Sequence, residues 1–297
     1  MLNKKVQNRQ LPVWIMAALS APVAIYGGKA SWVWTLIVGI ICSLLCIAVL
    51  KLENVKYGKI LRAAQIILLG VVGGRMSLEV SACWETEGMI MPLTLITLVV
   101  LSALGDAERN ARVCSVLAWI LGLLYIVCLA AGGKDIEMNW LLPTDCQEGM
   151  LVVVFLLPAV SVILPRETGK GRWGVLAVPL FAALIGIWCS GTLSPNVTKM
   201  VEIPFYEYSK SLSIFGVAER FEALVSVALT AGLFCTLSLL FNAAQHTITN
   251  GALISGIIAA VIMCLNVQIN PWILSILALI GWIMLPFIKS EKINRKK

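Results

Sequence analysis

Charged side chains and histidine are scarce in this sequence of 297 residues. Asp, Glu, Lys and Arg make up 13% of the chain, and there is one histidine. Soluble globular domains carry about 25% charged residues, so the composition excludes an ordinary soluble domain. A single histidine also argues against a metal centre, although Cys42 and Cys46 lie four residues apart in one apolar run.

Motifs of the common enzyme classes are absent as well. The sequence contains no nucleophile elbow, no phosphate-binding P-loop, no HExxH zinc motif and no GxGxxG dinucleotide fingerprint. Each of these motifs supplies a chemical group that its reaction needs. We therefore expect neither an enzyme nor a bound cofactor.

Hydrophobic residues make up 59% of the sequence and gather in long runs. Most runs have the length of about 17–25 residues that an α-helix needs to cross a bilayer, and a helix satisfies its own backbone polar groups there. The predicted fold class is therefore an all-α integral membrane protein with ten transmembrane helices. The predicted spans are 11–27, 31–50, 60–78, 88–105, 113–131, 149–165, 173–191, 217–243, 251–267 and 271–288.

The few charges alternate from one loop to the next. Lysine and arginine dominate both tails and the even-numbered loops, whereas aspartate and glutamate dominate the odd-numbered loops. Because lysine and arginine are retained on the cytoplasmic side, we predict a multi-pass protein of the cell membrane with both termini in the cytoplasm. The same flanks account for the net charge of +7, so we expect the lipid bilayer as a partner and no nucleic acid.

Two features of this topology leave alternatives open. Lys4, Lys5 and Arg9 precede the first span, as in a cleaved signal peptide, but no clear cleavage site follows and the second span begins almost at once. Cys83 and Cys146 fall in predicted exterior loops, where a disulfide bond between them is one alternative and two free thiols the other.

The exterior segment 132–148 divides the single domain of residues 1–297 into two halves of five spans, 11–131 and 149–288. An odd number of spans gives the two halves opposite orientations. Inverted repeats of this kind build many secondary transporters, in which discontinuous helices form the binding site near the midplane. We therefore predict a 5+5 inverted repeat with breaks in helices 1 and 6, the first helix of each half.

Proline lies inside both of these helices. Pro22 interrupts the first span and Pro158 the sixth, and each removes one backbone hydrogen bond. Freed carbonyls and helix ends can hold an ammonium or a carboxylate group. The alternative is a simple kink, which membrane helices tolerate. The candidate ligand-binding residues at the two breaks are Ser20, Ala21, Pro22, Leu157, Pro158 and Ala159.

Other polar residues interrupt the third and eighth spans. Arg75 lies one turn before Glu79 near the exterior end of the third span. A charge in a membrane helix is a candidate for function, and the alternative is an i,i+4 ion pair in which Arg75 reaches outward to the interface. Ser226 and Thr230 offer hydroxyls to a ligand or bond their own helix carbonyls. The candidates for an exterior vestibule are Arg75, Glu219 and Arg220.

Two further expectations concern packing and the exterior face. Gly70, Gly73 and Gly74 should let another helix approach the third span closely. The segment 192–216, between the seventh and eighth spans, is long for a membrane loop and should fold into a small helix over the exterior face.

Three stretches of the sequence together resemble one known family. The first, RQLPVWIMAALSAPVAIYGGKASWVWTLIVGI, carries a Gln-Leu pair and a Gly27-Gly28-Lys29-Ala30-Ser31-Trp32 turn. Two stretches follow it in the family's order: LGDAERNARVCSVLAWILGLLYIVCLAAGGKDIEMNWLLP and PFYEYSKSLSIFGVAERFEALVSVALTAGLFCTLSLLF. They resemble the B subunits of spore germination receptors, which belong to the amino acid–polyamine–organocation transporter superfamily. Ala30 departs from the family's usual acidic residue, and Leu157-Pro158-Ala159 departs from its Phe-Gly-Glu-like break.

The resemblance implies a membrane subunit of a nutrient germinant receptor, placed in the spore inner membrane. It implies a small nutrient ligand such as an amino acid, and two partner subunits, a large membrane protein and a lipoprotein. An amino-acid permease driven by a proton or sodium gradient is one alternative, and a scaffold subunit that binds no ligand is another. The lack of an acidic residue beside Pro158 favours the scaffold over the permease.

Overall fold

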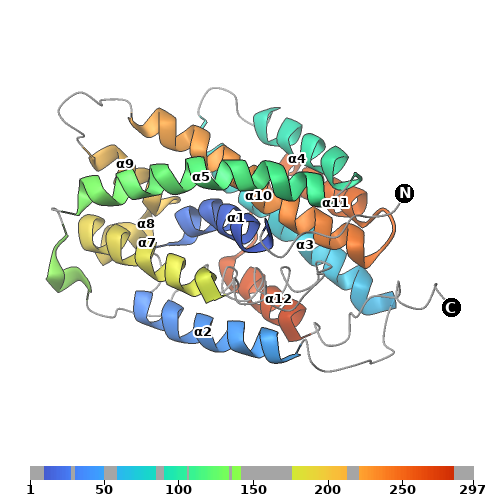
Figure 1. Cartoon of the computed structure of the whole chain (residues 1–297), viewed down its shortest axis with the longest axis horizontal. Coiled ribbons are helices and arrows are strands. Elements are labelled where there is room, and N and C mark those ends of the chain that lie inside the picture. The colour runs from blue at the N-terminus through green and yellow to red at the C-terminus, as the bar shows by residue number, and fades with distance from the viewer. Residues whose placement is uncertain are drawn as a thin grey trace.

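The computed structural model describes residues 10–27, 31–49, 59–84, 90–105, 107–133, 136–141, 176–212 and 221–283. These residues are 88% helical and include no strand. The first half contributes α1 (Gln10–Tyr26), α2 (Trp32–Val49), α3 (Lys59–Ser81), α4 (Ile90–Ala103), α5 (Ala107–Gly132) and the 3₁₀ helix η1 (Met138–Leu141). The second half contributes α7 (Ala177–Leu193), α8 (Pro195–Met200), α9 (Pro204–Ser211), α10 (Phe221–Thr247), α11 (Gly251–Cys264) and α12 (Pro271–Ile283). Figure 1 shows their arrangement.

The predicted spans agree with these helices wherever the structure describes them, and the all-α class is confirmed. Nine of the ten predicted spans overlap a helix, with ends that differ by up to six residues, and the sixth, 149–165, lies outside the described residues. Within the described part, three helical segments are long and apolar enough to cross a membrane. They are Ala63–Ser81 of α3, Ala107–Gly132 of α5 and Glu222–Thr247 of α10.

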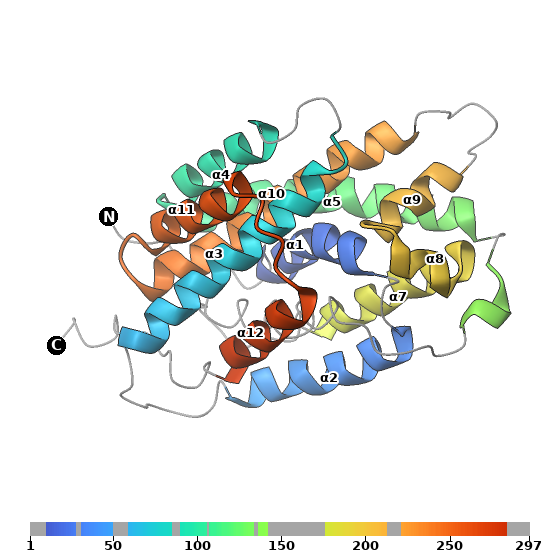
Figure 2. The same ribbon diagram turned by 180° about the vertical axis from the view of Figure 1, so that it is seen from behind.

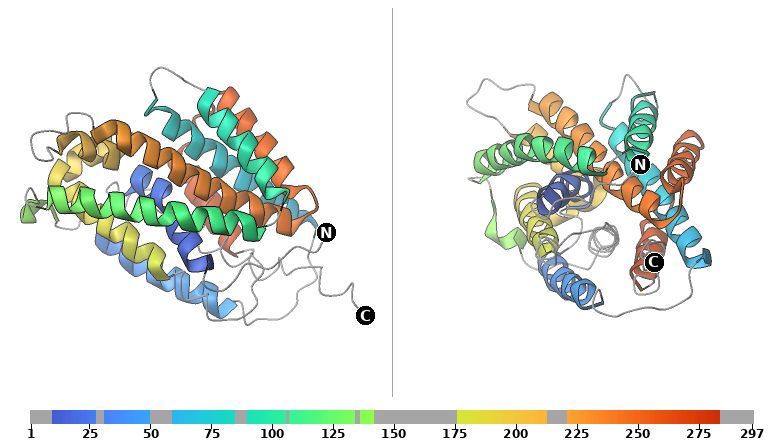
Figure 3. Two further views of the ribbon diagram at one scale, coloured as in Figure 1. Left: turned by 45° about the horizontal axis from the view of Figure 1, so that its top comes forward. Right: turned by 45° about the vertical axis from the view of Figure 1, so that its right-hand side comes forward.

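Helix α1 lies at the centre of the bundle. Every residue from Ala17 to Tyr26 is buried. Among the described helices, its main contacts are with α10 and α5, and it also contacts α7, α9 and α3. Figure 3 shows α1 surrounded by α5, α7 and α10. A helix that is apolar on all sides has to be enclosed in this way, which explains why this segment has no polar face.

Glycines bring α3 close to α10 and α11. A Cβ added at Gly70 would lie 2.8 Å from the Ser255 carbonyl oxygen, and one at Gly74 would lie 2.7 Å from the Ala259 carbonyl oxygen. A Cβ added at Gly73 would lie 3.0 Å from the Leu237 side chain of α10. The predicted close approach is therefore confirmed, and Figure 2 shows α3 running beside α10 and α11.

The segment between α7 and α10 forms two short helices, α8 and α9, where the sequence predicted one. Proline at the first position of each helix accounts for the division, because Pro195 and Pro204 favour a helix start and neither can continue a preceding helix. Helix α9 packs against α1, α7 and α10. The segment therefore covers the end of the bundle at which α1 terminates.

Candidate functional site

Helix α1 runs unbroken through Pro22. It is continuous from Gln10 to Tyr26, so the predicted break in helix 1 is wrong. The proline still lacks the N–H that would donate to the Ala18 carbonyl four residues earlier. The Thr236 hydroxyl of α10 donates to that carbonyl instead, over 2.7 Å. A neighbouring helix thus supplies the donor that the local sequence omits, and α1 stays helical.

A second hydroxyl reaches α1 from α5. The Tyr125 hydroxyl donates to the Ser20 carbonyl over 2.5 Å, and the Ser20 hydroxyl donates to the Ala17 carbonyl over 2.7 Å. Helix α10 comes close at this point because Gly232 has no side chain, and a Cβ there would overlap the Ser20 hydroxyl. The predicted ligand contacts Ser20, Ala21 and Pro22 are therefore buried against α5 and α10.

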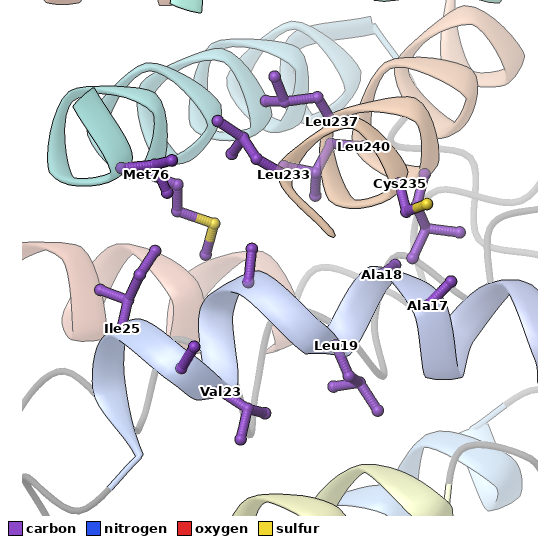
Figure 4. Packing of buried hydrophobic residues seen from close by; sticks show 14 of the residues in the cluster. Ala17, Ala18, Leu19, Val23, Ile25, Met76, Leu233, Cys235, Leu237 and Leu240 are labelled. Carbon is purple, nitrogen blue, oxygen red and sulfur yellow. The ribbon is translucent and has the colours of Figure 1, made fainter. Parts of the chain in front are cut away.

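Apolar side chains fill the rest of this helix crossing. Figure 4 shows Ala17 and Ala18 of α1 facing Cys235 on α10, while Ile25 lies toward Met76 of α3. All of these side chains belong to the buried core. The centre of the bundle is thus apolar, and polar contacts to α1 are concentrated at the Ala18 and Ser20 carbonyls and at its C-terminal end.

Charged groups meet α1 at that C-terminal end. Arg75 and Glu79 of α3 form an ion pair with an N–O distance of 3.0 Å, and the Tyr26 hydroxyl donates a hydrogen bond to Glu79. The Arg75 and Glu79 side chains are 17% and 11% exposed. Arg75 Nε is buried and has no hydrogen-bond partner in the described part of the chain. We call Tyr26, Arg75 and Glu79 the charged cluster.

The ion-pair interpretation of Arg75 is tested in part. The i,i+4 ion pair with Glu79 is confirmed. The reach of Arg75 to a membrane interface stays a prediction. Both side chains are mostly buried, and Glu79 is also bonded from Tyr26 of α1.

Hydroxyls on α10 bond their own helix, as one of the two sequence interpretations predicts. Ser226 donates to the Glu222 carbonyl over 3.0 Å, and Thr230 donates to the Ser226 carbonyl over 2.9 Å. The Thr230 oxygen also accepts a hydrogen bond of 3.1 Å from the Trp84 indole, just beyond α3. Thr230 therefore ties α10 to the end of α3, near the charged cluster.

Aromatic side chains hold α9 over this end of the bundle. Phe205 of α9 stacks on Tyr125 with ring centroids 4.6 Å apart, and Phe181 of α7 meets the other edge of Tyr125 at 5.3 Å. The Tyr208 hydroxyl donates to the Cys128 carbonyl over 2.7 Å. Tyr125 thus contacts α9 through its ring and α1 through its hydroxyl, so the position of α9 is linked to that of α1.

Charged side chains of α9 act on the Cys83 thiol, which lies just beyond the end of α3. Burial raises the pKa of the Cys83 thiol to about 12, and the nearby Lys210 lowers that pKa by less than burial raises it. A hydrogen bond to Glu207 raises the pKa of Lys210 above its ordinary value, with the two groups 2.9 Å apart. Cys83 is a free thiol, and Cys146 lies outside the described residues.

Several predicted site residues lie outside the described residues. They are Leu157, Pro158, Ala159, Glu219 and Arg220. The structure therefore tests the first predicted break and leaves the second a prediction. Within the described residues, no group of three or more metal-ligating side chains is brought together.

Four residues of this site were missed from the sequence: Tyr26, Tyr125, Gly232 and Thr236. Gly232 and Thr236 carry a usable signal, because a glycine and a hydroxyl four residues apart lie on one face of a helix and mark a close, hydrogen-bonded crossing in a membrane bundle. The tyrosines carry a weaker signal, an aromatic ring with a polar tip inside or at the end of an apolar run.

Comparison with protein-family models finds no match to this chain, and comparison with curated proteins finds none either. The residues that the structure describes form an all-helical bundle, and three of their helices are long and apolar enough to cross a membrane. Its distinguishing feature is a charged cluster that is mostly buried beside the end of a central helix.

Proposed function

We propose that this chain is the membrane subunit of a nutrient germinant receptor and binds a small zwitterion, such as an amino acid, in a transporter-like bundle. The observation that carries the proposal is the charged cluster, which places a guanidinium, a carboxylate and a phenol together between α1 and α3. Ionisable groups inside a membrane bundle are costly and commonly mark ligand or ion pathways.

The surface of the bundle supports a membrane location. On α5, the side chains of Trp119, Leu123 and Ile126 are 78%, 66% and 65% exposed, whereas Gln65 and Asn242 are buried. A large apolar surface promotes association in water but matches the hydrocarbon of a bilayer. We place the protein in the spore inner membrane with both termini in the cytoplasm.

Helix contacts support ten spans arranged as an inverted repeat. Exchanging each span with the one five positions later pairs α3 with α10, α4 with α11, and α5 with α12. Under this exchange, the α3–α11 contact corresponds to the α10–α4 contact. The α5–α10 contact corresponds to the α12–α3 contact. Both members of each pair occur among the described helices. A two-fold relation between halves produces such matched contacts.

The charged cluster offers each end of a zwitterion a partner. The Arg75 guanidinium can form paired hydrogen bonds to a carboxylate, and the Glu79 carboxylate and the Tyr26 oxygen can accept from an ammonium group. Each buried charge stays paired when the ligand replaces the Arg75–Glu79 contact. That replacement also changes the link from Glu79 to Tyr26, so ligand occupancy biases the position of α1, as a two-state receptor requires.

A scaffold subunit that binds no ligand is the second candidate. The observation in its favour is that Thr236 and Tyr125 already bond the Ala18 and Ser20 carbonyls of α1. In transporter-like proteins such carbonyls are among the groups that face a ligand or ion. The charged cluster favours the receptor over the scaffold, because a scaffold has no need of a buried ion pair.

A thermal-shift screen of the purified full-length protein against amino acids separates these candidates. We expect at least one amino acid to stabilise the protein, since a ligand at 100 times its Kd adds about 2.7 kcal/mol. Arg75→Gln should remove this shift, measured from its own ligand-free midpoint. Arg112→Gln is the matched control, because Arg112 forms an i,i+4 pair with Glu108 on an exposed part of α5.

Each result of the screen and its companion assay has a defined meaning. Stabilisation by no amino acid contradicts the receptor and supports the scaffold. A shift that survives Arg75→Gln contradicts the charged cluster as the binding site. Gradient-driven accumulation of an amino acid in proteoliposomes contradicts a receptor that only senses, and supports a permease.

A genetic test addresses the role in germination and the partner subunits. Deletion of the gene should abolish germination in response to some nutrient while vegetative uptake of that nutrient stays normal. Affinity purification from spore membranes should recover a large membrane subunit and a lipoprotein. Normal germination of the deletion strain with every nutrient tested contradicts the proposal.

A further inference from the structure

Three side chains of α1 and α3 carry buried polar atoms without a hydrogen-bond partner. Within the residues that the structure describes, nothing bonds the Trp14 indole N–H, the Gln10 side-chain oxygen or either end of the Gln65 amide. Trp14 is 0% exposed and Gln65 is 1% exposed, whereas Gln10 is partly exposed. An unpaired polar group in a bundle interior is destabilising, so a set of them at one place indicates a ligand that supplies the missing partners.

Trp14 and Gln65 lie on the faces that α1 and α3 turn toward each other. Figure 4 shows Ile25 of α1 lying toward Met76 of α3, and the two helices are in contact. Trp14 precedes Ile25 by eleven residues, and Gln65 precedes Met76 by the same number. Eleven residues are about three helical turns, so each polar residue shares the face of the apolar residue that follows it. Gln10 lies one turn before Trp14 on that face of α1.

Helices α1 and α3 also run in the same direction, which puts these side chains at one end of the bundle. Both helices meet α10 at positions that rise along their own sequence as they fall along α10. The pairs are Ala18 with Thr236 and Ser20 with Gly232 for α1, and Gly73 with Leu237 and Trp84 with Thr230 for α3 and the turn that follows it. Gln10, Trp14 and Gln65 therefore all lie toward the C-terminal end of α10, whereas the charged cluster lies toward its N-terminal end.

We propose that Gln10, Trp14 and Gln65 form a water-binding site, in which ordered water bridges α1 and α3. The three side chains are uncharged, and together they offer N–H donors and oxygen acceptors. This combination suits a small neutral molecule that both donates and accepts, and buried water molecules commonly make about three hydrogen bonds to otherwise unpaired groups. Gln10 provides the entry, because it is partly exposed and lies one turn from the buried Trp14.

The site is separate from the charged cluster and does not depend on the proposed receptor function. Ten residues of α3, about 15 Å of helix, separate Gln65 from Arg75. On α1, the segment from Ala17 to Ala24 lies between the two sites and is buried, and its side chains are apolar except for Ser20. Water that enters at Gln10 should therefore stop at this segment and leave the charged cluster without a solvent path from that end.

Radiolytic labelling of the wild-type protein in lipid nanodiscs tests the proposal. A short X-ray exposure in isotopically labelled water converts bound water into hydroxyl radicals, which oxidise the side chains beside them. We expect Trp14 to gain the heavy oxygen, whereas Met76 should stay unlabelled. Met76 is the matched reference, because methionine is readily oxidised and Met76 is 1% exposed among apolar side chains. Equal protection of Trp14 and Met76 would overturn the proposal, and this comparison needs no variant to fold.

Two variants test whether Gln65 and Trp14 share the water. Gln65→Met removes the amide donor and acceptor, so the heavy-oxygen uptake of Trp14 should fall. Leu69→Met is the matched control, one turn further along α3 and fully buried, and it should label like the wild type. Unchanged labelling of Trp14 in Gln65→Met would contradict a shared site. A rise of several degrees in the thermal midpoint of Gln65→Met would contradict it as well, because an amide that already has water partners gains little from an apolar replacement.

Discussion

At Pro22 the backbone of α1 lacks a donor, and the Thr236 hydroxyl supplies one 2.7 Å from the Ala18 carbonyl oxygen. The same hydroxyl lies 2.9 Å from the Gly232 carbonyl oxygen of its own helix, so one proton serves two acceptors. A buried carbonyl without a partner costs about 1–3 kcal/mol. The stabilisation that the Thr236 hydroxyl gives to α1 therefore depends on the presence of proline at position 22.

A double-mutant cycle tests this dependence. Thr236→Val should lower the free energy of unfolding by about 1–2 kcal/mol, because the Ala18 carbonyl loses its donor. In a Pro22→Ala background the loss should be smaller by about 1 kcal/mol, since the substituted alanine would supply its own backbone N–H. The Thr236–Gly232 contact is lost in both backgrounds and cancels. Denaturant unfolding in detergent micelles measures the cycle, and additive effects would contradict the assignment.

Cys83 offers a pH-dependent test at the rim of the bundle. Burial raises its thiol pKa to about 12 from an ordinary value of 9.0, and the thiolate is the reactive form. At pH 8 roughly one thiol in ten thousand is ionised. The native alkylation rate should therefore keep rising about tenfold per pH unit above pH 9, whereas the rate in denatured protein should level off there.

Mass spectrometry of the Cys83 peptide after timed iodoacetamide treatment reads both rates. Steric shielding alone would lower the native rate at every pH without moving its midpoint, and that result would contradict the pKa shift. The sign for stability follows from the raised pKa. The contribution of the buried neutral thiol to the free energy of unfolding is fully present below pH 9 and is lost as the pH rises toward 12.

At the scale of the helices, the crossing of α1 and α10 depends on Gly232. A Cβ at this position would overlap the Ser20 hydroxyl and would lie 3.0 Å from the Ala21 nitrogen. Gly232→Ala should therefore cost about 1–3 kcal/mol of unfolding free energy through overpacking. Gly122→Ala is the control on α5, where an added Cβ meets nothing within 4 Å. The control should stabilise its helix by up to about 1 kcal/mol.

The free energies of unfolding of both variants, measured in the same detergent, test this prediction. Equal stabilisation by Gly232→Ala and Gly122→Ala would contradict a close crossing at Ser20. A destabilisation confined to Gly232→Ala would support it, because helix propensity favours alanine at both positions and only one of them faces another helix.

The positions of the helices follow largely from the sequence, whereas their mutual contacts do not. The lengths of the apolar runs predicted α1 and α11 to within a few residues, because a continuous apolar segment in the sequence is the main signal of a membrane helix. Helix α5 begins at Ala107, before the predicted residue 113, since Glu108 and Arg112 extend it as a paired polar turn. The apolar run alone does not predict this extra turn at the start of α5.

The site was less predictable because its determinants lie far apart in the chain. The break expected at Pro22 fails through a donor more than 200 residues later, Thr236. The contact of Tyr26 of α1 with Glu79 is likewise absent from the sequence pattern. Proline chemistry and ion-pair spacing are local rules, and neither identifies the side chain that another helix contributes in the tertiary fold.

At the scale of the whole molecule, large apolar side chains lie on the surface of the described helices as well as in their core. Trp119 is exposed at the middle of α5, while Ser238 and Asn242 of α10 are buried and hydrogen-bonded to each other. A lipid environment would permit this arrangement, because exposed apolar side chains cost nothing there and buried polar groups find partners between helices. The basic flanks predict the orientation of the bundle in such a membrane.

Reporter fusions test that orientation. A fluorescent protein fused after Lys297 should be fluorescent and alkaline phosphatase at the same place inactive, because the basic residues from Lys289 to Lys297 predict a cytoplasmic location for this segment. Alkaline phosphatase inserted after Gly133, at the end of α5, should be active on the other side. Active phosphatase after Lys297 would reverse the topology. It would also place Tyr26, Arg75 and Glu79 on the cytoplasmic side, where an external nutrient would not reach them directly.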